Sequence, residues 1–135
     1  MAYEKRRLRE VDTAGSYSKV QALTEADAST ADPSVNSYGF SVIDVGTTAA
    51  AQANDATFAL AAPAAGGVHK YISVLSGTTD AVIITTHSTA VTFFGSTDAT
   101  VTATTGAAAR HLELIATSST GWAVIAESTG WTFSA

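Results

Sequence analysis

Three histidines, His69, His87 and His111, are the side chains best suited to acid–base or metal chemistry in this sequence. Local metal motifs place their ligands only a few residues apart. These histidines are separated by 18 and 24 residues, without the tight His/Glu cluster of a cupin-type site. We therefore predict no metal site, although histidines on adjacent strands could still meet in the folded chain.

Other catalytic patterns are also missing from the sequence. Serine hydrolases of the elbow type carry G-x-S-x-G, which does not occur here. Glycosidases need two carboxylates on one cleft, whereas Asp80 and Asp98 fall in predicted turns and Asp44 and Glu113 stand alone on predicted strands. There is no P-loop, G-x-G-x-x-G or EF-hand pattern. We predict no catalytic residue, no cofactor and no enzymatic activity; a small cupin-like or hydrolase-like enzyme is the third hypothesis.

Charge is divided unevenly along the chain. The sequence holds 7 Lys and Arg against 12 Asp and Glu, for a net charge of −5. Before residue 20 the net charge is +2; from residue 20 onward it is −7, with Lys70 and Arg110 as the only cations. A basic segment on an acidic body favours contact with an acidic partner surface. The alternative is a solvated tail that has no partner.

Residues 1–38 are predicted to form an extended arm. They are rich in Ser, Thr, Asp, Ala and Gly with Pro33 as a breaker, and 20–28 could hold one or two helical turns capped by Thr24. Nucleic acid is not the expected partner, because acidic residues flank the basic run and no aromatic platform accompanies it. Tyrosines suit anchor points, and Tyr38 is one of them. The predicted partner contacts are Tyr3, Lys5, Arg6, Arg7, Arg9, Tyr17 and Lys19.

Composition restricts the class of protein. The 135 residues correspond to one domain, with 46% hydrophobic and 14% charged residues and no cysteine, so disulfides and thiolate sites are excluded. Ala, Thr, Ser and Gly exceed half of the chain, which leaves a modest core and favours self-association. No apolar run reaches the roughly 18 residues of a membrane span. The charged start lacks the apolar region of a secretion signal, so we expect synthesis in a cytoplasm and no membrane partner.

Short β-type runs alternate with turn signals from residue 39 onward. Turns recur roughly every 8–12 residues, which is typical of sandwiches, jelly rolls and small barrels. We expect an all-β, jelly-roll or β-barrel-like (β-tulip-type) domain of about eight short strands over residues 39–135. The predicted strands are 39–45, 56–62, 68–76, 81–86, 90–94, 99–104, 110–117, 122–128 and 131–135.

Two tryptophans stand at the starts of predicted strands. Trp122 and Trp131 each follow a glycine. In these positions we expect them to cover the open end of the β core or to lie at an oligomer interface. If both rings were exposed together, they could instead form a stacking platform for a sugar.

The segment RHLELIATSSTGWAVIAESTGWTF (110–133) resembles the closing hairpin of many tailed-bacteriophage virion proteins. In those proteins an LxLIA-type strand turns through Ser, Thr and Gly into GWxVIxxSG. Over residues 68–133 the chain is similar in texture to capsid decoration (cement) proteins and to some fibre-associated β domains. No functional residue carries over, because that family has no catalytic set.

The resemblance implies a structural role in a virion. It implies a homotrimer on the outer capsid surface, whose arms bind the major capsid protein and stabilise the shell by mass action and avidity. The protein would be made in the host cytoplasm and would contact neither nucleic acid nor membrane. The alternative is a tail-fibre or spike β module that binds host-surface glycans, with Trp122 or Trp131 as the stacking platform.

Overall fold

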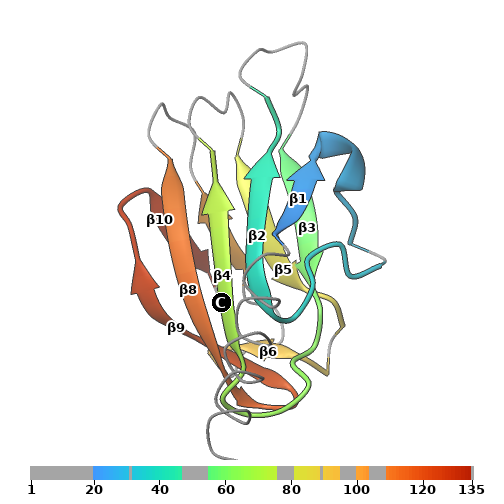
Figure 1. Ribbon diagram of the computed structural model, residues 1–135, viewed down its shortest axis with the longest axis vertical. Coiled ribbons are helices and arrows are strands. Elements are labelled where there is room, and N and C mark those ends of the chain that lie inside the picture. The colour runs from blue at the N-terminus through green and yellow to red at the C-terminus, as the bar shows by residue number, and fades with distance from the viewer. Residues whose placement is uncertain are drawn as a thin grey trace, which may run out of the picture.

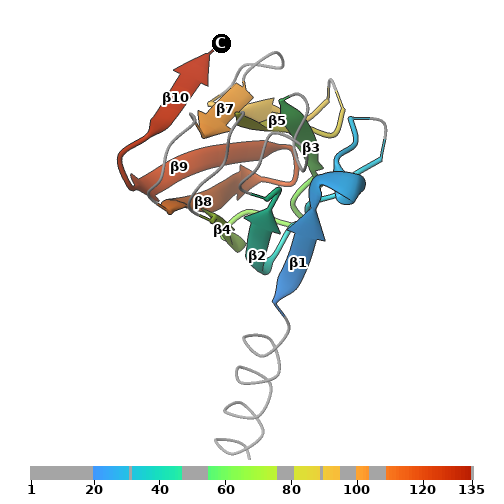
Figure 2. The same cartoon turned by 90° about the horizontal axis from the view of Figure 1, so that it is seen from above.

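Two β-sheets face each other around one hydrophobic core (Figures 1 and 2). The computed structural model describes residues 20–30, 32–46, 55–75, 81–88, 90–94, 100–103 and 109–134. Within these ranges the chain forms ten strands, one short 3-10 helix and no α-helix. The predicted all-β class is therefore confirmed, and no helix among these residues is long and apolar enough to cross a membrane.

The strands are divided between a six-stranded and a four-stranded sheet. The larger sheet has the order β1 (Gln21–Thr24), β2 (Gly39–Asp44), β4 (His69–Val74), β8 (Arg110–Ser118), β9 (Gly121–Glu127) and β6 (Thr92–Phe93). The smaller sheet has the order β10 (Trp131–Ser134), β7 (Thr100–Ala103), β5 (Val82–Thr86) and β3 (Ala56–Leu60). Both sheets are mixed, because four of the eight neighbouring pairs are parallel.

Alternation of side chains explains which face of each strand is buried. In β8, Leu112, Leu114 and Ala116 point into the core, and the residues between them point outward. In β7, Val101 and Ala103 are buried between outward-facing threonines. Branched aliphatic side chains from both sheets meet in one cluster around Phe58, Phe93 and Trp122. The period-2 pattern therefore gives the sheets one apolar and one largely polar face.

The predicted strand positions agree with strands β2 to β10 to within two residues at either end. The hairpin predicted at 110–128 is formed by β8 and β9, which pair antiparallel through a turn at Ser119 and Thr120. The expected number of about eight strands was too low, because all nine predicted segments from residue 39 onward form strands and β1 was not predicted. Two predicted turns, at 77–80 and 95–98, lie outside the described residues.

Residues 21–38 belong to the β domain rather than to the extended arm predicted for residues 1–38. Strand β1 pairs in parallel with β2, and Leu23 and Val35 are buried in the core. The predicted helical turn is the 3-10 helix η1 (Glu25–Asp27), which Thr24 precedes as its N-cap. The Asp27 carboxylate accepts hydrogen bonds from the Thr24 amide (2.7 Å) and hydroxyl (3.1 Å). Pairing partners so distant in sequence leave no local signal, so the boundary at residue 38 was placed too late.

Candidate functional site

The predicted contact residues separate into two groups. Tyr3, Lys5, Arg6, Arg7, Arg9, Tyr17 and Lys19 lie outside the described residues. Trp122 lies in the core with 1% of its surface exposed, and its Nε1 donates a hydrogen bond to the Ala61 carbonyl (3.2 Å). Trp131 is half-buried against the core, and its Nε1 donates to the His111 carbonyl (3.0 Å). Trp122 consequently has no ring face free for a sugar.

Two of the three histidines, His69 and His111, flank Tyr71 on the outer face of the six-stranded sheet. The rings of His69 and His111 stack against Tyr71 at centroid distances of 6.2 and 6.3 Å. The ring of Phe40 also stacks against Tyr71, with centroids 4.6 Å apart. His69 Nδ1 lies 3.7 Å from the Glu113 carboxylate. No three potential metal ligands cluster anywhere in the described part of the chain. His87 follows β5 in the opposite sheet.

A buried polar network, which we call the Lys70 network, ties residues 21–38 to the sheet. Lys70 is completely buried, and its Nζ donates to Asn36 Oδ1 (2.6 Å), Ser41 Oγ (2.6 Å) and the Tyr38 carbonyl (3.0 Å). Ser41 in turn donates to Gln21 Oε1 (2.6 Å). Burial lowers the pKa of Lys70 from 10.5 to about 7.

The Lys70 network has the residue types of a Ser–Lys catalytic dyad but not the access. A serine beside a lysine of lowered pKa can act as a nucleophile where substrate reaches it. Ser41 and Lys70 are both 0% exposed, and Nζ donates to three acceptors, from Asn36, Tyr38 and Ser41. The network is therefore structural, and nothing in the sequence pattern distinguished Lys70 from a surface lysine.

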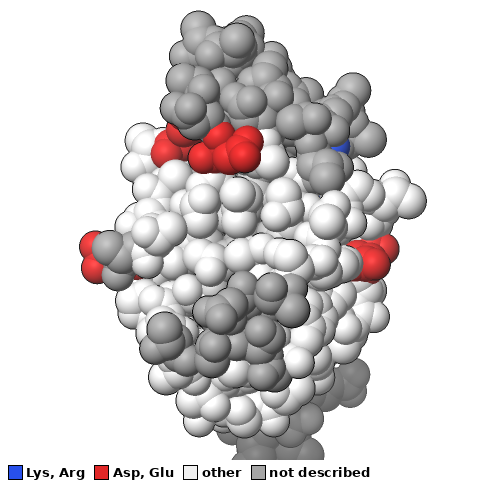
Figure 3. Space-filling model, turned by 180° about the vertical axis from the view of Figure 1, so that it is seen from behind, with Lys and Arg blue, Asp and Glu red and all other residues white. Residues whose placement is uncertain are grey.

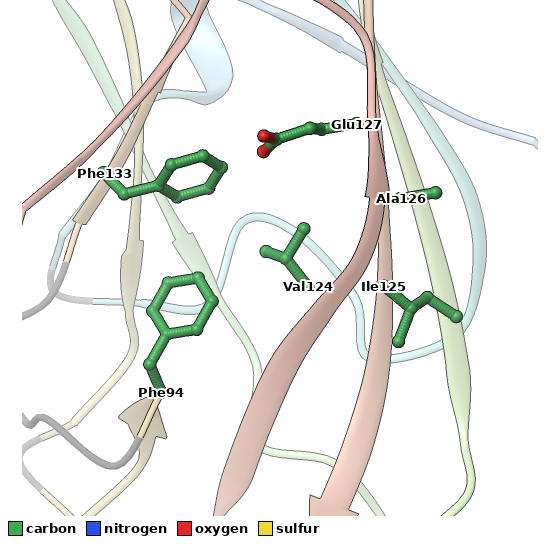
Figure 4. A pocket seen from close by; sticks show the side chains of 6 residues that line it. All are labelled: Phe94, Val124, Ile125, Ala126, Glu127 and Phe133. Atoms are coloured by element: carbon green, nitrogen blue, oxygen red, sulfur yellow. The ribbon is translucent and has the colours of Figure 1, made fainter.

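An open pocket lies on the other side of the molecule, between β9 and the end of β6 in one sheet and β10 in the other (Figure 4). We call it the edge pocket; its volume is about 450 Å³. Its lining residues are Phe94, Val124, Ile125, Ala126, Glu127 and Phe133. One carboxylate among five apolar residues is an arrangement typical of a small-ligand site.

A β-bulge places the carboxylate of Glu127 in the edge pocket. Along β9, Val124 pairs with Leu114 and Ala126 pairs with Glu113, so Ile125 is an extra residue without a partner in the register. The extra residue reverses the alternation that follows it. Glu127 therefore pairs with the inward-facing Leu112, and Figure 4 shows Glu127 and Val124 on the same side of the strand, across from the two phenylalanine rings.

Phe94 forms the opposite wall of the edge pocket in a strained backbone conformation. Its φ of 52° makes it the one non-glycine residue with positive φ in the described part of the chain. Its ring is 51% exposed and meets Phe133 edge to face, with centroids 5.6 Å apart and planes at 87°. Bulky residues in this conformation cost of order 1 kcal/mol and concentrate at binding sites. Strain and exposure of the same aromatic residue therefore indicate a binding role.

Glu127 has no described cation beside it. Within the described residues, the one side-chain ion pair is His69–Glu113. Arg110 is on the inner face of the neighbouring strand, but it is buried against Gly130 and does not line the edge pocket. Its Nη1 is buried without a hydrogen-bond partner. The edge pocket thus joins a carboxylate that has no described counterion to two aromatic walls.

The edge pocket was not predicted from the sequence. Glu127 is one of nine carboxylates from residue 20 onward, and Phe94 is the last residue of the strand predicted at 90–94. A run of two phenylalanines before Gly95 is the one local signal that could have indicated a turn with an exposed ring. The bulge depends on pairing between β8 and β9 and has no signature in the sequence of β9 alone.

Comparison with known proteins does not assign this chain to a family. The sequence matches no model of a protein family, and no curated protein matches it. The functional conclusion therefore depends on the charges, contacts and cavities of the chain itself.

Proposed function

We propose that this chain is a capsid decoration (cement) protein of a bacteriophage virion, which binds the outer capsid surface and bridges subunits of the major capsid protein. The observation that carries the proposal is the separation of charge along the chain. Both described cations, Lys70 and Arg110, are buried, while most described carboxylates are exposed. The remaining five cations all belong to residues 1–19.

This distribution of charge supports different roles for the basic segment, residues 1–19, and for the acidic body that follows it. An acidic capsid surface would repel the body and attract the basic segment. Tyr3, Lys5, Arg6, Arg7, Arg9, Tyr17 and Lys19 are the proposed capsid contacts. Binding only to the assembled shell would stabilise that shell by mass action, without any catalytic step.

The outer face of the four-stranded sheet supports the proposed homotrimer. Strands β3, β5, β7 and β10 contain no charged residue, and Figure 3 shows an uncharged surface over them with carboxylates at its margins. Its outward side chains are mainly hydroxyls, such as Thr85, Thr100 and Thr102. Like-charged bodies can approach along such a face at low electrostatic cost. Two facing sheets around one core are compatible with the proposed jelly-roll or β-barrel-like (β-tulip-type) class, although four parallel strand pairs depart from the antiparallel pairing usual in jelly rolls.

Immunogold electron microscopy of virions from the phage that encodes the chain tests this function. The expected result is label over the head facets. Label confined to the tail would favour the alternative, a fibre or spike module that binds host-surface glycans. Protein that is abundant in infected cells but absent from every virion would contradict both structural roles.

A second experiment tests the charge argument with the full-length protein. Charge reversal of Arg6, Arg7 and Arg9 to Glu should abolish co-sedimentation with capsids. The control reverses a charge on the body at an exposed position, with Asp32→Lys. If the arm variant still co-sediments at full strength, the basic segment is not the capsid-binding element.

A further inference from the structure

We propose that the edge pocket binds an alkylammonium group, carried either by a lysine side chain or by a small quaternary amine. This binding site is independent of the proposed capsid role. The proposal follows from the combination of Glu127, whose carboxylate pairs with no described cation, with the aromatic walls formed by Phe94 and Phe133.

The two rings suit a cation because they form two perpendicular walls. Their planes meet at 87° with centroids 5.6 Å apart, and both side chains remain partly exposed. A cation within about 6 Å of a ring centroid is attracted by the negative charge of the ring face. In Figure 4 the rings stand across the pocket from Glu127 and Val124, so a bound ammonium would lie between rings and carboxylate.

The charge of the pocket selects against other ligands. An anion would be repelled by Glu127, and a neutral apolar group would cover that carboxylate without pairing it, at a cost in free energy. A sugar needs several donors and acceptors, but the other five lining residues have apolar side chains. An alkylammonium ion satisfies both features, because its methylene or methyl groups contact the apolar walls while its charge pairs with Glu127.

The backbone at Phe94 gives independent support for a binding role. A glycine at position 94 would adopt φ 52° without strain, yet the chain has a phenylalanine there with half of its ring exposed. The neighbouring Phe93 already fills the core and is completely buried. The ring of Phe94 is therefore presented to the pocket at a cost in backbone energy, which ligand contact would explain.

The test is an NMR titration of the full-length, isotope-labelled protein with choline, whose control is its uncharged isostere 3,3-dimethylbutan-1-ol. Choline should shift the amide signals of Phe94, Val124, Glu127 and Phe133 in a saturable way. The isostere should bind at least about fivefold more weakly, because it lacks the charge. Saturable binding of the isostere with an affinity equal to that of choline would overturn the proposal.

Variants separate the contribution of each wall. Glu127→Gln and Phe94→Gly should each weaken choline binding about two- to fivefold. Glu113→Gln is the matched control, since Glu113 lies on the adjacent strand and faces outward. Affinities unchanged by Glu127→Gln would contradict the role of the carboxylate and hence the proposal.

A capped lysine peptide distinguishes the two sources of the ammonium group. Tighter binding of the peptide than of choline would indicate a lysine side chain of a protein partner. Tighter binding of choline would indicate a small quaternary amine. Either order supports the alkylammonium site, whereas failure of both probes to bind excludes it. None of these results depends on capsid binding, so failure here and failure of the decoration function are distinguishable.

Discussion

Polar groups near the two edges of the six-stranded sheet differ in whether they have partners within the described chain. At the β1 edge, Nζ of Lys70 is buried within hydrogen-bond distance of three acceptors of the same chain. On the β9–β6 side, Glu127 faces a pocket without a described partner, and Phe94 has a strained backbone. The first arrangement uses polar groups for cohesion, and the second leaves them available to a ligand.

This difference shows how function can be separated from stability in a chain without a catalytic motif. Groups that satisfy each other stabilise the fold, and their loss leaves unpaired partners in the interior. Groups that remain unsatisfied at an accessible place add little stability and are therefore candidates for binding. Variants at the β1 edge should accordingly lower the free energy of unfolding, whereas variants at the edge pocket should mainly weaken ligand binding.

The largest effect is expected from Lys70→Ala. The substitution removes a buried side chain and leaves Asn36 Oδ1 and the Tyr38 carbonyl without their donor. We expect a loss of about 3–5 kcal/mol in the free energy of unfolding, measured by urea denaturation. Choline affinity of the remaining folded protein should stay unchanged. A loss below about 1 kcal/mol would show that the Lys70 network is not cohesive.

The Lys70 network should also make stability depend on pH. In the folded chain the pKa of Lys70 is about 7, against 10.5 for an ordinary lysine. Between pH 7 and pH 10.5 the Lys70 side chain binds a proton in the unfolded chain but not in the folded chain. The free energy of unfolding therefore rises with pH in this range, and the cost of burying Lys70 is greatest below pH 7. The slope is at most about 1.4 kcal/mol per pH unit. Urea denaturation at several pH values from 7.5 to 9.5 should show that the free energy of unfolding rises less steeply with pH in Lys70→Met than in the unchanged protein. An equal rise with pH in both proteins would contradict the lowered pKa.

Gly130→Ala should have an intermediate effect on stability. Gly130 has φ +93°, and an added Cβ would lie 2.6 Å from Arg110 Nε. We expect a loss of about 1–3 kcal/mol from backbone strain and the displaced guanidinium. Gly67→Ala is the matched control, because Gly67 has φ +86° with no atom within 4 Å of the added Cβ. If both variants lose equal stability by thermal denaturation, the Arg110 contact is unimportant.

The smallest effect on stability is expected at Phe94. Phe94→Gly relieves the strain at φ 52° but loses the contact with Phe133, so the free energy of unfolding should change by less than about 1 kcal/mol. Phe94→Ala loses the same ring and keeps the strain. Calorimetry should therefore give a higher Tm for Phe94→Gly than for Phe94→Ala. This order is the reverse of the usual one, in which glycine is the less stable replacement. The usual order would show that Phe94 is not strained.

Sequence patterns predicted the strands well and the binding features poorly. The hairpin of β8 and β9 was predictable because its turn residues and alternating apolar residues are adjacent in sequence. Strand β1 was missed because only Leu23 among its residues is buried, and because its partner β2 begins far along the chain. For Trp122 the core position was among the predicted outcomes, and its indole is indeed buried.

The sequence by itself determined the all-β class, the positions of most strands and the separation of basic and acidic charge. These properties depend on residue types within a few positions of one another, where steric preferences and alternation operate. Only the tertiary structure decided that Lys70 is buried and bonded to Asn36, and that a bulge at Ile125 turns Glu127 into the pocket beside Phe94. Both outcomes depend on strand pairing between distant segments, and an identical local sequence would fit either face of a sheet until that register is set.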